Sequence, residues 1–210
     1  NLLDDYTLLA SAPQNNKPNY ICVSGSAPYN TLEEMVAWAK ENPGKLKVNV
    51  NKNTIGEVYA KLLVQHFELD VKCIEATGDE AKVGILGGLI DVGFFNQTVT
   101  EQYAGSGDYK ALASMSVKRD TEKLTDVPSY GDLGLESMVV PSYMLLVGPK
   151  GMDDGVADKI NALSLGFSDA AEANAFIEQQ GSLYVPRTRD ELKEIVEEMY
   201  DKIGQVFGAQ

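Results

Sequence analysis

The sequence predicts an α/β protein with a largely parallel or mixed sheet, and three observations support that class. Strand-like runs alternate with segments whose apolar residues recur at helical spacing. Thr-x-x-Glu sequences that begin at Thr31, Thr98 and Thr188 mark three helix starts. The stretch 81–97, AKVGILGGLIDVGFFNQ, has the pattern of one complete unit, in which Gly87 and Gly88 separate a helix from a buried strand.

The other elements follow the same two periodicities along the chain. Runs of β-branched and aromatic residues predict strands at 6–10, 20–23, 45–50, 71–75, 89–95, 110–116, 138–147 and 183–185. Helical spacing predicts helices at 32–41, 55–66, 81–86, 98–105, 154–165, 169–180 and 188–207, with Pro43, Gly44 and Gly181 among the stop signals. The polar connection 118–135 interrupts this alternation and is the candidate passage between two lobes.

Composition limits the classes of function. A chain of 210 residues with a formal net charge of -13 can form one large domain or two small ones, and it lacks the basic surface that nucleic-acid binding requires. Acidity does not exclude a small anionic ligand, because helix N-termini and backbone amides bind anions locally. No run approaches the roughly 20 apolar residues of a membrane-spanning helix. The sequence opens almost directly on the first predicted strand, as expected of a mature or trimmed chain.

Catalytic and metal-binding signatures are missing from the sequence. His66 is the single histidine, no GxSxG elbow or Walker sequence occurs, and Cys22 and Cys73 fit no metal motif. We therefore expect a protein without enzymatic activity, metal or cofactor. Both cysteines lie in strand-like runs and are expected to be buried thiols, and they could pair only if their strands are neighbours. The acidic pairs at 153–154 and 197–198 are expected to be solvated.

Polar turns that follow predicted strands supply the candidate ligand contacts. These residues are Asn51, Asn53, Thr54 and Gly56 after the strand 45–50, Thr77 and Gly78 after the strand 71–75, and Asn96 and Gln97 after the strand 89–95. Each turn by itself could be an ordinary helix cap. If the strands are neighbours, the turns share one cleft at the strand carboxyl ends, where ligands of open α/β sheets bind.

Five segments carry a family resemblance, in order over nearly the whole chain. They are TLEE…NPGKL at 31–46, LGGLIDV at 86–92, KR…LTDVPSYGDLGL at 118–135, YMLLVGP at 143–149 and DKIN at 158–161. Together they resemble the substrate-binding proteins of tripartite tricarboxylate transporters, the TctC or Bug family.

That resemblance implies a two-lobed, periplasmic-binding-protein-like (type II) fold. Such a protein captures a small carboxylate or amino-acid-like ligand and delivers it to the membrane permease subunits of a tripartite transporter. The resemblance also implies an extracytoplasmic location, periplasmic or as a cell-surface lipoprotein. Residues 25–140 would form the second lobe, and residues 1–24 and 141–210 part of the first, with Tyr143 among the ligand contacts. A ligand-sensing domain of the same architecture and an α/β enzyme remain as alternatives.

The chain departs from the family pattern at three places. Residues 49–56, with one glycine, replace a loop rich in glycine and serine, and Glu75, Ala76 and Thr77 replace the family's "YKG". If Glu75 lines the cleft, it would repel a carboxylate, and we then expect a ligand that carries an amine, a hydroxyl or a cation beside its carboxylate. The family's N-terminal segment has no counterpart, so we expect an incomplete first lobe with an exposed apolar surface. We expect either a homodimer formed through that lobe or a loose first lobe that binds its ligand weakly.

Overall fold

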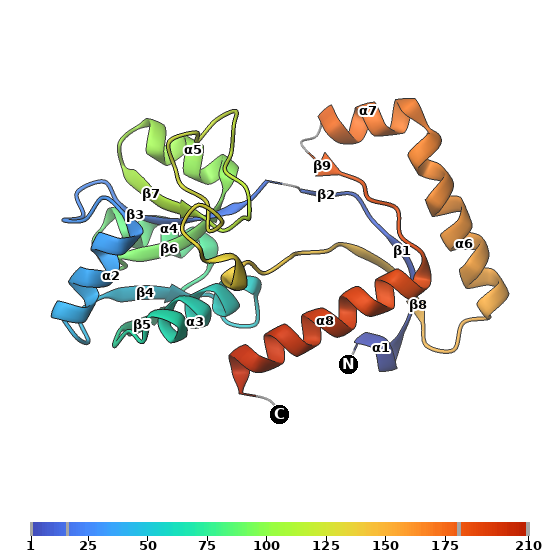
Figure 1. Ribbon diagram of the computed structural model, residues 1–210, viewed down its shortest axis with the longest axis horizontal. Coiled ribbons are helices and arrows are strands. Elements are labelled where there is room, and N and C mark those ends of the chain that lie inside the picture. The colour runs from blue at the N-terminus through green and yellow to red at the C-terminus, as the bar shows by residue number, and fades with distance from the viewer. Residues whose placement is uncertain (1, 16, 180–181, 209–210) are drawn as a thin grey trace. The chain divides into compact units, whose positions relative to one another are not determined.

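The computed structural model describes residues 2–15, 17–179 and 182–208 (Figure 1). The chain folds into two compact units. We call them the continuous unit, Pro18–Val140, and the terminal unit, which combines Asn1–Lys17 with Pro141–Gln210.

The continuous unit is built on a mixed five-stranded sheet, as the alternation of strands and helices predicted (Figure 1). In spatial order its strands are β5 (Lys72–Glu75), β4 (Lys47–Val50), β6 (Val92–Asn96), β3 (Asn19–Ser24) and β7 (Tyr109–Ser114). β4 runs parallel to β5 and to β6, whereas β3 runs antiparallel to β6 and to β7.

Helices cover both faces of this sheet. They are α2 (Leu32–Glu41), α3 (Ile55–Phe67), α4 (Gly78–Leu86) and α5 (Gln97–Gly105), followed by the 3₁₀ turn η1 (Glu136–Met138). Phe94 and Phe95 are neighbours on β6 and therefore point to opposite faces. The Phe94 ring lies 6.0 Å from the ring of Tyr59 on α3, whereas Phe95 stacks on Tyr109 and joins the core cluster of Ile85 on α4. α3 thus packs on one face, and α4 and α5 on the other.

Of the three expected capping boxes one forms fully, one forms in part and one is wrong, and a further box was missed. At α2 the Thr31 hydroxyl oxygen accepts from the Glu34 N–H at 3.1 Å as expected, but Glu34 Oε2 accepts from the Asn30 N–H instead of the Thr31 N–H. Thr188 and Glu191 form the reciprocal pair that the sequence predicted. Thr98 does not cap a helix, because α5 begins one residue earlier with Asn96 as its cap. A box that the sequence reading missed joins Thr77 to Glu80 at the start of α4.

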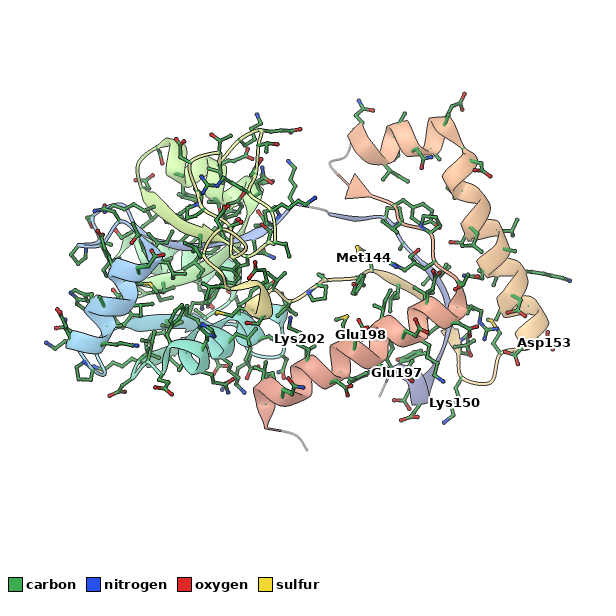
Figure 2. All side chains as sticks on the ribbon, viewed as in Figure 1. Met144, Lys150, Asp153, Glu197, Glu198 and Lys202 are labelled. Atoms are coloured by element: carbon green, nitrogen blue, oxygen red, sulfur yellow. The ribbon has the colours of Figure 1, made fainter. Side chains whose placement is uncertain are left out.

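The terminal unit holds the antiparallel strands β1 (Tyr6–Ser11) and β8 (Leu145–Pro149). Leu192 of α8 (Arg189–Phe207) is buried against Leu8 of β1, and Asn161 of α6 (Asp154–Gly166) donates from Nδ2 to the Leu9 carbonyl at 2.8 Å. The shorter elements are α1 (Leu2–Asp5), β2 (Gln14–Asn15), η2 (Phe167–Asp169), α7 (Ala171–Gln179) and β9 (Ser182–Leu183). The side chains of Asp153, Glu197 and Glu198 are exposed, as expected for solvated faces (Figure 2).

Three boundaries differ from the sequence prediction. Residues 19–24, expected in the first lobe, belong to the continuous unit because β3 is hydrogen-bonded to β6 on one side and to β7 on the other. The strand predicted at 138–147 is confined to β8, and η1 and an irregular segment around Pro141 precede it. The predicted end of the helix at Gln180, with its stop signal Gly181, lies outside the described residues.

The two cysteines are free thiols in different surroundings. Cys22 is buried on β3, but Cys73 is exposed on the edge strand β5, contrary to the expected pair of buried thiols. Two strands separate β3 from β5, and a spacing of about 4.8 Å per strand puts them roughly 14 Å apart, too far for a disulfide. Burial raises the pKa of the Cys22 thiol to about 12.

The connection 118–135 is organised around Asp132. Its carboxylate accepts hydrogen bonds from the backbone N–H of Ser129 at 2.8 Å, from the Ser129 hydroxyl at 2.9 Å and from Arg119 Nε at 2.8 Å. The hydrogen bond from the Ser129 N–H, followed by those from Arg119 and the hydroxyl, lowers the pKa of Asp132 to about 2.

We expect the continuous unit to lose stability as the pH falls from about 4, the ordinary pKa of an aspartate, to about 2, the pKa of folded Asp132. The sign follows because folding favours the charged carboxylate, so protonation removes its contribution. Urea unfolding followed through Trp38, the single tryptophan, measures this dependence. Asp132→Asn should flatten the pH profile in that window, and an unchanged profile would contradict the assignment.

Candidate ligand-binding site

Three helices begin at one edge of the five-stranded sheet. β5, β4 and β6 are adjacent and parallel, so their carboxyl ends share an edge, which we call the carboxyl edge. Residues 51–54 join β4 to α3, residues 76–77 join β5 to α4, and α5 follows β6 directly. Val50 pairs with Glu75, so the first two turns leave the sheet at the same level. The neighbouring strands that the sequence argument required are therefore present.

The chain leaves β4 and β6 toward opposite faces of the sheet. α3, which follows β4, packs on the face of Phe94, whereas α5, which follows β6, packs on the face of Phe95. β4 and β6 are direct neighbours. This arrangement is a topological switch point, and the crevice at the carboxyl ends of such strands is the usual ligand site of open α/β sheets.

The turn after β4 is held in one conformation by its own polar groups. Thr54 caps α3, because its hydroxyl oxygen accepts from the Gly56 N–H at 3.1 Å and its hydroxyl donates to the Asn51 carbonyl at 2.7 Å. Asn53 has a φ of 58° and donates from its N–H to Glu57 Oε2 at 3.0 Å. That hydrogen bond lowers the pKa of Glu57. Four of the predicted contact residues therefore build a preset helix start.

The turn after β5 presents two backbone donors. The Thr77 hydroxyl oxygen accepts from the Glu80 N–H, and Glu80 Oε2 accepts from the Thr77 N–H at 2.8 Å. The N–H groups of Gly78 and Asp79 have no hydrogen-bond partner within the described residues, so they remain available to an anion. Asn49, a buried residue that the sequence reading missed, fixes the turn by donating to the Ala76 carbonyl at 3.0 Å.

The two amide residues predicted after β6, Asn96 and Gln97, differ in burial. Asn96 is exposed, and its side-chain oxygen accepts from the Val99 N–H at 3.0 Å. Gln97 is buried instead, and its Nε2 donates to Asp120 at 2.6 Å and to Glu101 at 2.7 Å. The Gln97 side chain therefore holds the connection 118–135 against α5. Its backbone N–H, like that of Thr98, has no partner in the described part of the chain.

Glu75 is not an isolated negative charge. Its Oε2 lies 2.5 Å from Lys52 Nζ, in an ion pair that links the turns after β4 and β5. The hydrogen bond to Glu75 raises the pKa of Lys52. The repulsion of a carboxylate that the sequence predicted is thus offset by a cation, which the sequence reading did not place in the site.

Tyr143 belongs to the terminal unit, whereas the other predicted contacts belong to the continuous unit. The Tyr143 ring is half-buried, and the Arg187 guanidinium lies over it at 5.8 Å from the ring centroid.

The described residues hold neither a metal-binding cluster nor a membrane-spanning helix. No group of three or more His, Cys, Asp or Glu side chains among them could hold a metal ion. None of the helices within these ranges is long and apolar enough to cross a membrane.

Sequence comparisons identify the relatives of this chain. A profile described as "Tripartite tricarboxylate transporter family receptor", or TctC, matches residues 4–209. A UPF0065 protein of Bordetella pertussis is 21% identical over 203 residues, which cover 96% of this chain and 62% of that relative. The chain therefore spans less than two thirds of the length of this curated relative.

Solved structures show the same fold. The periplasmic binding protein BugD is similar with a TM-score of 0.73 at 21% identity, over 97% of this chain and 69% of BugD. MatC from Rhodopseudomonas palustris with bound malate has a TM-score of 0.72 at 21% identity, over 96% of this chain and 69% of MatC. Since the profile match covers almost every residue, the chain belongs to the tripartite tricarboxylate transporter receptor (TctC) family.

Proposed function

We propose that the protein is an extracytoplasmic solute-binding protein that captures a small carboxylate-bearing metabolite for the permease of a tripartite tricarboxylate transporter. The observation that carries this proposal is the carboxyl edge, where three parallel strands each lead into a helix start. Backbone N–H groups without a partner and the positive ends of three helix dipoles favour an anion there, despite the net charge of -13.

The proposed ligand class follows from the family and from this donor set. MatC, which shares the fold, was solved with malate, a dicarboxylate. Capture needs hydrogen-bond donors, and no nucleophile or base. The alternative of an enzyme would need His66 near the ligand. His66 lies in the last turn of α3, at the far end of that helix from the carboxyl edge, and so does not support an enzyme. Tyr143 stays in the proposed set of ligand contacts.

We expect calorimetry on the purified protein to detect at least one small carboxylate that binds with a Kd of about 10 µM or less, which corresponds to roughly 7 kcal/mol. The panel should contain dicarboxylates, a tricarboxylate, acidic and neutral amino acids, and an uncharged diol as control. Binding of the diol alone, or of no compound by a folded protein, would contradict the proposal.

Homodimerisation through the terminal unit is part of the same proposal. An apolar groove in that unit is lined by Leu146, Leu163, Phe167, Ile177 and Tyr184, and the side chains of Leu146, Leu163 and Phe167 are about half exposed or more. Contact with a second chain would remove these side chains from water. Light scattering should then give twice the chain mass, and a monomer at micromolar concentration would exclude the dimer.

A further inference from the structure

We propose that the ion pair of Lys52 and Glu75 selects ligands that carry an ammonium group beside a carboxylate over plain carboxylates. This inference rests on the proposed function and names the class of ligand that the carboxyl edge takes.

The ion pair lies where such a ligand would bind. Lys52 is in the turn between β4 and α3, and Glu75 is the last residue of β5, directly across from Val50 in the ladder. Both charged groups therefore stand at the carboxyl edge, where α4 also begins with the free N–H groups of Gly78 and Asp79. The side chains of Lys52 and Glu75 are 58% and 61% exposed, so an entering ligand can reach both.

The surrounding structure fixes the backbone segments that carry the two charges. The hydrogen bonds of Asn53 and Thr54 define the turn that carries Lys52. The ladder and the bond from Asn49 to the Ala76 carbonyl define the end of β5. A backbone that is already fixed at both residues reduces the entropy that ligand binding must remove.

The neighbouring charges add one further acidic group to the pair, because the Glu57 carboxylate also acts on the Lys52 ammonium. The other acidic side chains of the two turns already have partners, since Glu57 pairs with Lys61, Asp79 with Lys82 and Glu80 with Thr77. A plain dicarboxylate that approaches Lys52 also approaches Glu75. Its attraction to the Lys52 ammonium and its repulsion from the Glu75 carboxylate therefore largely cancel. A ligand with both charges can place its carboxylate on Lys52 and its ammonium on Glu75, and so satisfies both groups.

The test uses two sets of ligands that differ only in the group beside one carboxylate. The first is glutamate, 2-hydroxyglutarate and glutarate, and the second is aspartate, malate and succinate. In at least one set we expect the amino member to bind about tenfold more tightly than the unsubstituted member, a ratio worth about 1.4 kcal/mol. Glu75→Gln should reduce that ratio to about one, because the neutral amide offers no charge to the ammonium.

Glu41→Gln is the matched control, because it makes the same charge change at the end of α2, which leads into the opposite end of β4. It should leave the preference unchanged. Equal affinity for all members of both sets, or a full preference in Glu75→Gln, would overturn the inference while leaving the proposed function intact. If a folded protein binds no member of either set or of the wider panel, the proposed function fails and the inference fails with it.

Discussion

Replacing Gly78 by proline is expected to weaken carboxylate binding by about tenfold or more while α4 remains folded. Proline removes one N–H donor, and a hydrogen bond to a charged group contributes about 1.5–3 kcal/mol. The backbone accepts the change, because Gly78 is the first residue of α4, where proline is favoured. Thr77, with φ of -65° and ψ of 167°, already has the extended conformation required before a proline.

Gly78→Ala is the control that distinguishes the effect of losing the N–H donor from the effect of adding a side chain. A Cβ at this position meets nothing within 4 Å, and alanine keeps the N–H. Calorimetry should therefore show near-normal affinity for the alanine variant and a clear loss for the proline variant. Equal affinities of the two variants would mean that this N–H does not contact the ligand.

Gly131→Ala is expected to cause a large loss of stability of the continuous unit. A Cβ at Gly131 would stand 1.9 Å from the backbone oxygen of Val117, which cannot move aside as a flexible side chain could. Relief of the clash would break the hydrogen bond from the Gly131 N–H to the Ser116 carbonyl, now 3.2 Å long. We expect a destabilisation of about 3 kcal/mol or more.

Urea unfolding followed through Trp38 measures this loss, because Trp38 lies in α2 of the same unit. Gly105→Ala is the matched control, since a Cβ there meets nothing within 4 Å and alanine favours the helical conformation. Its unfolding midpoint should stay the same or rise. If the Gly131→Ala protein is as stable as the wild type, the close approach of the Gly131 backbone to the Val117 carbonyl is wrong.

Local sequence patterns predicted the features that depend on neighbouring residues. Strand and helix periodicity gave the α/β units, and the pair Gly87 and Gly88 marked the helix end, where Gly88 has a φ of 70°. The polar turns were identified as helix starts because caps are short-range features. Thr98 was misassigned for the same reason, since Asn96, two residues earlier, is also a good cap and the strand ends there.

Features that depend on register could not be derived in the same way. The ion pair of Lys52 and Glu75 forms only because Val50 and Glu75 are opposite each other, across 25 positions of sequence. Burial of Gln97 depends on Asp120, which a distant connection brings to α5. β3 was assigned to the wrong unit because its two partner strands follow it much later in the chain.

The central claim is that a carboxylate binds at the carboxyl edge of the continuous unit. Nuclear magnetic resonance titration of the nitrogen-15-labelled protein, with the tightest carboxylate of the panel, tests it most directly. The largest changes should appear at the backbone amides of the three helix starts, which are Ile55, Gly78, Asp79, Gln97 and Thr98. The opposite edge of the sheet carries a pocket lined by Tyr29, Trp38, Leu86 and Gly88. Changes confined to that pocket, with the helix-start amides unmoved at saturation, would contradict the claim.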